Sequence, residues 1–168
     1  MKATLKLEDG REIAVEVSEE TFKQIEKPVK KTGYEKVEDG EFHCLVGGDG
    51  KIYEYSIHNT YDMEAYNRGN YYSDKTVAEN NARDDTLKSK LRRFAVEHRK
   101  TELDWYNSEQ VRWCIYYDYT NDILDCDFEY NYREFGKIYF DTEETAKAAI
   151  EEFKDELIWY FTEYKDSL

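Results

Sequence analysis

Hydrophobic and polar residues alternate at the start of the chain, which is typical of β-strands with one buried face. The alternation runs over residues 2–17 and is interrupted by Asp9-Gly10, a dipeptide that favours a hairpin turn. Ser18 then provides a helix N-cap, and Pro28 ends the short helix that we expect after it. The pattern predicts a small ββα module over residues 1–28, followed by a basic, turn-prone linker.

A second hairpin and a long helix are predicted next. Residues 42–46 and 51–58 alternate as strands do, and the glycine-rich segment between them favours a turn. Residues 59–70 are polar and contain several Tyr and Asn residues, so we expect a loop there. From Ser73 onward, apolar residues recur with a period close to 3.6, which predicts an amphipathic helix over residues 74–99.

The last third of the chain predicts another hairpin and two helical stretches. Residues 111–119 and 123–130 have the alternation of paired strands. A short strand over residues 137–140 leads to Asp141, where a capping-box-like pattern begins a helix. A second helical pattern over residues 157–164 either continues this helix or forms a separate one.

A faint internal repeat links these two parts of the chain, because residues 72–79 match residues 140–147 at an offset of 68. In each copy a hairpin and a glycine-containing loop come before the match, and a capped helix follows it. We therefore predict an α+β fold, with antiparallel hairpins packed with one long central helix and a C-terminal helix, as two ββ(β)α units. The main domain is expected over residues 34–168, beside the N-terminal module. A general similarity of strand-cap-helix joints is the alternative to a true duplication.

Composition indicates a folded and strongly acidic protein. The 168 residues contain 38 Asp+Glu and 24 Lys+Arg, for a net charge of -14, and the aromatic content of 16% argues against disorder. No segment is apolar enough for a transmembrane helix, and the first residues lack the apolar part of a signal peptide. We therefore expect a cytoplasmic protein with no membrane partner. The negative charge argues against direct nucleic-acid binding.

The charge is unevenly distributed along the chain. Residues 1–82 have a net charge of -6 and residues 101–168 have -12, whereas residues 83–100 have +4. The basic segment predicts a cationic helix face, which is either simply solvated or in contact with an anionic ligand. We call its candidate residues the basic patch: Arg83, Lys88, Arg92 and Arg93.

The acidic segment contains a strand whose carboxylates fall on one face. Asp125, Asp127 and Glu129 alternate with apolar residues, so consecutive carboxylates lie about 6.8 Å apart along the strand. DNA carries one phosphate per roughly 3.4 Å of each strand, so such a row can imitate phosphates electrostatically. Tyr rings beside carboxylates suit contact with an arginine-rich surface. We call the candidate partner-binding residues the acidic face: Tyr116, Asp118, Asp122, Asp125, Asp127, Glu129 and Tyr130.

Two other interpretations of the acidic strand stay open. One is the solvated outer face of a half-buried strand. The other is a divalent-cation site, although the EF-hand pattern fails because Tyr130 and Gly136 occupy the positions that require Gly and Glu.

No catalytic motif, metal site or cofactor site is predicted. The cysteines are widely spaced in apolar, strand-like segments, so we expect core residues: Cys44, Cys114 and Cys126. His43 and Cys44 are neighbours on a strand, point to opposite faces and cannot share a metal. A Cys–His nucleophilic pair assembled by the fold is the remaining enzymatic alternative.

The runs RGNYYSDKTVAENNARDDTLKSKLRRFAVEHR and IYYDYTNDILDCDFEYNYREFGKIYFDTEETAKAAIEEF resemble small proteins encoded by phages and prophages of Gram-positive bacteria. The resemblance covers residues 34–160 and carries over no catalytic residue. It implies a phage accessory protein that acts in the bacterial cytoplasm. Small acidic proteins of that origin often inhibit host defence, including anti-CRISPR proteins that occupy the nucleic-acid channel of a Cas nuclease.

Four functions are therefore considered. The first is a non-enzymatic inhibitor whose acidic face occupies a basic nucleic-acid-binding surface, such as that of a Cas nuclease. The second is a sponge protein that sequesters a signalling nucleotide through the basic patch and tyrosines. A nucleic-acid-binding accessory protein ranks third, and an enzyme ranks last.

Overall fold

The computed structural model describes residues 2–6, 10–16, 18, 31–56, 59–130 and 132–166. The chain divides into two compact units, Met1–Thr32 and Gly33–Leu168. In the first unit, β1 (Lys2–Lys6) and β2 (Glu12–Glu16) form the expected antiparallel hairpin. The short helix expected before Pro28 lies outside the described residues.

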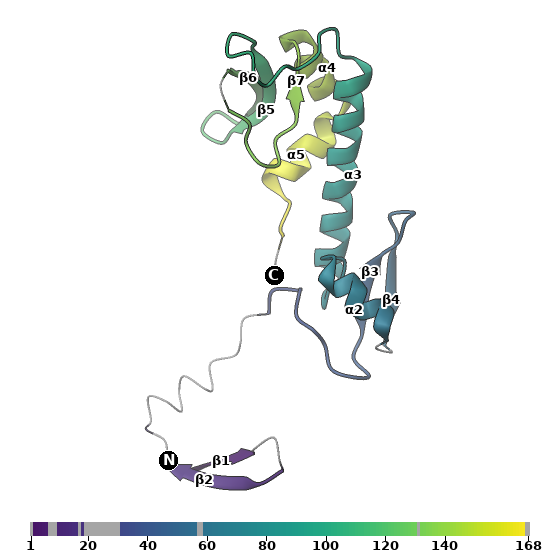
Figure 1. Cartoon of the computed structure of the whole chain (residues 1–168), viewed down its shortest axis with the longest axis vertical. Coiled ribbons are helices and arrows are strands. Elements are labelled where there is room, and N and C mark those ends of the chain that lie inside the picture. Colours follow the sequence, from purple (N-terminus) through teal and green to yellow (C-terminus); the bar gives the residue numbers. More distant parts are fainter. Residues whose placement is uncertain are drawn as a thin grey trace. The chain divides into compact units, whose positions relative to one another are not determined.

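The second unit is organised along the helix α3 (Lys75–Glu97), which confirms the expected long helix (Figure 1). The Asp74 side chain accepts a hydrogen bond from the amide of Val77 and so caps the helix N-terminus. Val96 is exposed, but most of its apolar residues fall on one stripe and are buried: Val77, Ala78, Ala82, Leu87, Leu91 and Ala95.

The N-terminal half of α3 packs against the hairpin of β3 (His43–Val46) and β4 (Ile52–Tyr55). The prediction of a polar loop over residues 59–70 is wrong in part, because this segment contains the helix α2 (Thr60–Asn67). A capping box begins this helix: Asn59 accepts from the Asp62 amide, and Asp62 accepts from the Asn59 amide. That reciprocal pair satisfies two backbone donors and offsets the weak helix propensity of Tyr and Asn.

The C-terminal half of α3 packs against a second layer. There, β5 (Arg112–Asp118) is the central strand between β6 (Ile123–Glu129) and the two-residue strand β7 (Tyr139–Phe140), all antiparallel. The helices α4 (Glu143–Glu152) and α5 (Lys154–Thr162) are separate. The non-helical backbone of Phe153, with φ -115° and ψ 21°, divides them.

The two parts of the second unit share one plan, as the internal repeat predicts. In each part, the segment after the hairpin pairs antiparallel with the hairpin's first strand, through Cys44–Tyr72 in one and Trp113–Phe140 in the other. A side-chain N-cap follows two residues later, from Asp74 and from Thr142 respectively. The first strands both begin at a buried polar residue, His43 and Arg112.

The main hydrophobic core lies where α3, α4, α5 and the sheet β6-β5-β7 meet. Its buried residues come from the three helices, β6 and β7, and include Leu87, Leu91, Cys126, Phe140, Ile150 and Leu157. A smaller cluster under β3 contains Cys44, Tyr72 and Val77. Among the residues that the structure describes, no helix combines the length and the apolar character of a membrane span.

Candidate functional site

The acidic face lies on the side of the sheet that faces away from α4. Strand register places Asp125 opposite Tyr116 and Asp127 opposite Cys114. On the other side, Leu124 and Cys126 pack into the main core with α4. Alternation along β6 therefore separates carboxylates from core residues, as the sequence predicts.

Asp125 and Asp127 have no close ion-pair partner among the described residues, although Asp125 interacts electrostatically with Lys147 of α4. Each accepts a hydrogen bond only from the backbone amide that follows it, at 2.8 and 2.7 Å, and neither forms an ion pair with any described residue. Desolvation, followed by the charges of Asp125 and Asp127, raises the pKa of Tyr116 above its ordinary value. The phenol therefore stays protonated beside two carboxylates, as a hydrogen-bond donor on the same face.

Glu129 does not stand free beside Asp125 and Asp127 as the expected row of carboxylates requires, because its carboxylate is engaged within the fold. Lys137 pairs with it, and the Tyr139 hydroxyl donates to it at 2.9 Å. Its side chain is only 13% exposed. Burial opposes ionisation, but the hydrogen bonds from Lys137 and Tyr139 outweigh it and lower the pKa of Glu129. This carboxylate anchors the segment before β7 to the sheet.

The Glu129→Gln variant is expected to lose about 1 kcal/mol of stability at pH 7, because it removes the ion pair with Lys137. The folded-state pKa of Glu129 lies below its unfolded value, so the carboxylate stabilises the fold above about pH 4.3. That stability is lost as the pH falls through the folded-state pKa. Urea unfolding between about pH 7 and pH 3 should therefore show that the free energy of unfolding falls less steeply with decreasing pH in the variant than in the parent protein.

Glu102→Gln is the matched control, since the Glu102 carboxylate is paired with Arg99 but 90% exposed. Its unfolding free energy should follow that of the parent protein at every pH. Parallel pH curves for the parent and Glu129→Gln would contradict the structural role of Glu129.

Asp118 and Asp122 shape the turn at the end of the β5–β6 hairpin. Asp118 accepts from the Asn121 side chain at 2.7 Å and from the Thr120 amide at 2.8 Å, and these bonds lower its pKa. Asp122 has a φ of 59° and accepts from the Tyr117 hydroxyl. Both carboxylates lie at the end of the acidic face and hold the turn.

Exposed aromatic rings border the acidic face. Tyr116 is 40% exposed and Tyr130 is 43% exposed, as expected for interface residues. Phe128, which alternation places with the core residues, is 45% exposed beside Tyr130, with ring centroids 5.3 Å apart. Phe135 is fully exposed in the segment before β7. Sequence patterns did not indicate these two phenylalanines as exposed, because strand alternation groups Phe128 with the core residues and Phe135 lies outside any strand.

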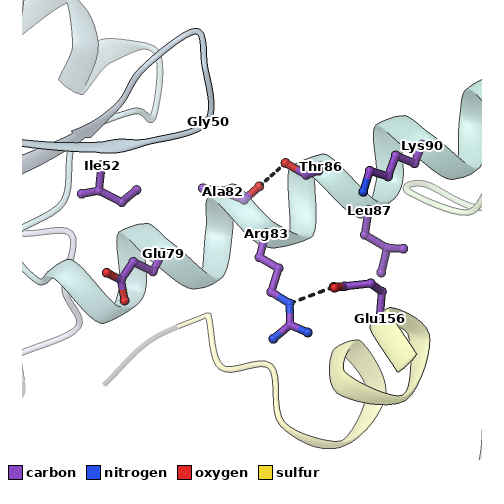
Figure 2. A pocket seen from close by; sticks show the side chains of 9 residues that line it. All are labelled: Gly50, Ile52, Glu79, Ala82, Arg83, Thr86, Leu87, Lys90 and Glu156. Carbon is purple, nitrogen blue, oxygen red and sulfur yellow. Dashed lines mark hydrogen bonds and ion pairs between the residues drawn. The ribbon is translucent and has the colours of Figure 1, made fainter. Parts of the chain in front are cut away.

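The basic patch does not form one surface. Figure 2 shows Arg83 reaching from α3 to Glu156 of α5, with Nε 2.8 Å from the carboxylate. The Arg83 guanidinium also lies 3.9 Å from the Trp159 ring centroid. Lys88 pairs with Asp84 at 2.7 Å. Arg83 therefore links α3 to α5 and Lys88 is paired within α3, whereas Arg92 and Arg93 are exposed without an ion pair to any described residue.

Arg93 lies in a hollow beside α3 together with Lys90, which the candidate residues did not include. The hollow has a volume of about 450 Å³ and is lined on its far side by the glycine-rich turn Gly47–Gly50. It adjoins a smaller hollow of about 270 Å³ between α3, Ile52 and Glu156 (Figure 2). Thr86, Lys90 and Arg93 share one face of α3 through their helical spacing. That spacing is the sequence pattern that could have indicated this site.

The cysteines and His43 have structural roles. All three thiols are free and buried, and burial raises their pKa values, which disfavours a nucleophilic thiolate. The His43 ring lies 3.3 Å from Asp62 and stacks on Tyr71 with centroids 4.6 Å apart. Within the described residues, no group of three His, Cys, Asp or Glu side chains is placed to hold a metal ion.

Comparison of the chain with known protein families, with characterised proteins and with solved structures gave no match. We therefore infer the function from the residues and geometry of this chain.

Proposed function

We propose that this protein is a non-enzymatic inhibitor that binds a basic nucleic-acid-binding surface through its acidic face. The observation that carries this proposal is the pair of carboxylates of Asp125 and Asp127, which form no ion pair with any described residue and lie beside exposed Tyr116. Carboxylates and protonated Tyr hydroxyls together bind guanidinium groups well, and the rings add cation–π contacts. The expected target is a bacterial defence nuclease, such as a Cas effector, in the cytoplasm of the host of a phage.

The electrostatics also favour fast association with such a target. Residues 101–168 have a net charge of -12, which attracts a basic channel over a long range at low salt. Salt screens this attraction, so an inhibitor of this kind binds more weakly as ionic strength rises.

Capture from a nuclease-treated lysate of a Gram-positive bacterium tests the proposal. The immobilised protein should retain nucleic-acid-binding proteins, and these should elute as salt rises from about 0.05 to 0.5 M or when duplex DNA is added. A partner that DNA does not release, and that salt does not elute, would contradict the proposal.

A second function is favoured by the hollow beside α3. Lys90 and Arg93 line the hollow opposite the turn Gly47–Gly50. Cationic side chains beside glycines, whose backbone can approach a ligand closely, suit a phosphate group. Asp85 also lines this hollow, and Asp49 in the turn is paired with Lys51 at 3.3 Å. In this second proposal, the protein is a sponge for a signalling nucleotide whose phosphates contact the two cations.

Cyclic dinucleotides should then raise the melting temperature of the protein, and the Lys90→Ala/Arg93→Ala variant should lose that shift. Arg92→Ala is the matched control, because Arg92 is an exposed arginine of α3 outside the hollow. No shift with any dinucleotide, or equal shifts in all three proteins, would exclude the sponge.

A further inference from the structure

The strand β5 has an open edge for half of its length. On one side β6 pairs with all of Arg112–Asp118, but on the other side β7 pairs only with Trp113 and Cys114. Residues 115–118 make no backbone hydrogen bond on that side to any residue that the structure describes. An open strand edge presents unpaired N–H and C=O groups, which another extended chain can satisfy.

A cavity of about 570 Å³ lies along this open edge. Its walls are β5, the segment 135–138 that leads into β7, and residues of α3 and α5. Most of the lining is apolar or aromatic, with the main contributions from Leu87, Leu91, Ile138, Leu157, Tyr160 and Phe161. A cavity of this size and character accommodates apolar side chains beside the strand edge.

The two sides of the sheet at this edge differ in chemistry. Ile115 and Tyr117 share the side of α3 and α5, where most of their neighbours are apolar or aromatic and Lys88 and Lys137 also line the cavity. Tyr116 and Asp118 share the opposite side with Asp125. A strand added here would alternate its side chains between the cavity and the acidic face.

We propose that an extended segment of the target protein, with alternating apolar and basic residues, adds to the open edge of β5 as a further strand. Its apolar side chains enter the cavity, and its basic side chains lie beside Tyr116 and Asp118. An extended peptide can form main-chain hydrogen bonds with residues 115–118, which β7 leaves unpaired, and this favours such a peptide over other ligands. This inference rests on the proposed inhibitor function and names the chemistry of the segment that is bound.

The probe is a seven-residue, end-capped peptide of alternating arginine and valine, followed by fluorescence anisotropy and residue-resolved amide exchange. The peptide should bind and slow exchange about tenfold or more at alternate amides within residues 115–118. A peptide with glutamate in place of arginine should bind at least about tenfold more weakly. Absence of binding by the arginine peptide, or protection on β6 instead of β5, would overturn the proposal.

Two backbone-modified peptides isolate main-chain pairing from side-chain contacts. One is N-methylated at every arginine and the other at every valine. Because alternate residues of a strand direct their N–H groups to opposite edges, only one of the two modifications should abolish binding. Equal binding by both modified peptides would show that the cavity accepts side chains without strand addition, which contradicts the proposal.

A matched pair of protein variants locates the peptide. Tyr116 and Tyr55 are 40% and 42% exposed, but Tyr116 lies on β5 and Tyr55 lies on β4, outside the acidic face. Tyr116→Lys should weaken the arginine peptide about tenfold through like-charge repulsion, whereas Tyr55→Lys should change its affinity less than about twofold. If the peptide fails while DNA still displaces a captured partner, only the strand addition is wrong, and the inhibitor function stands.

Discussion

The Asp125→Lys/Asp127→Lys variant is expected to lose affinity for its basic target by about a hundredfold or more. Both carboxylates lack an ion pair among the described residues, so the reversal removes two attractive charges and introduces two repulsive ones. The fold should be retained, because among the described residues both side chains accept a hydrogen bond only from the next amide. Calorimetric titration of the captured partner with the variant measures the change, and circular dichroism checks the fold.

Glu151→Lys/Glu152→Lys provides the matched control. These two exposed carboxylates belong to α4, which packs against the opposite side of the sheet, and the variant changes the net charge equally. Affinity should stay within about threefold of the parent protein, apart from the general effect of net charge. Acidic residues on an edge strand also prevent strand-to-strand aggregation. If Asp125→Lys/Asp127→Lys binds as the parent does, that protective role is the whole function of these carboxylates.

The Arg112→Met variant is expected to lose about 3 to 5 kcal/mol of stability. Arg112 is 1% exposed and donates to the carbonyls of Gln110 at 2.9 Å and Asn107 at 3.1 Å, and also to those of Asp104 and Tyr130. Removal of the guanidinium takes away these donors at the start of β5, where the Asp104 and Asn107 carbonyls keep only a backbone amide donor, at 3.2 and 3.3 Å. Urea unfolding should show the loss as a lower transition midpoint.

Arg133→Met is the control for Arg112, because the Arg133 guanidinium lies over the same Trp105 ring, at 5.0 Å against 4.6 Å. Arg133 is exposed, so its replacement should lower the free energy of unfolding by less than about 1 kcal/mol. Equal destabilisation by the two substitutions would mean that the ring contact, rather than the buried hydrogen bonds, carries the effect of Arg112.

Local patterns predicted most of the fold. Strand alternation and turn residues located all three hairpins, and the 3.6-residue period located α3 within two residues of its ends. The helix α2 was missed because its capping box uses Asn59 and Asp62 in place of the more common Ser or Thr with Glu. Those residues are equally typical of turns, so the sequence pattern did not distinguish a loop from a helix.

The site was less predictable, because its charges are set by distant partners. Arg83 is neutralised by Glu156, 73 positions along the chain, and Glu129 by Lys137 across a loop. Neither pairing follows from local spacing. The alternation on β6 did place Asp125 and Asp127 on one side, since that property depends only on strand geometry.

The most direct measurement is a competition between this protein and target DNA for one RNA-loaded Cas nuclease from a Gram-positive bacterium. Fluorescence anisotropy of a labelled duplex reports how much DNA the nuclease still binds as the protein is added. If the acidic face occupies the nucleic-acid channel, the protein should displace the duplex completely. The concentration required should rise about tenfold or more between roughly 0.05 and 0.5 M salt. A ternary complex that retains the duplex, or displacement that is independent of salt, would contradict this account.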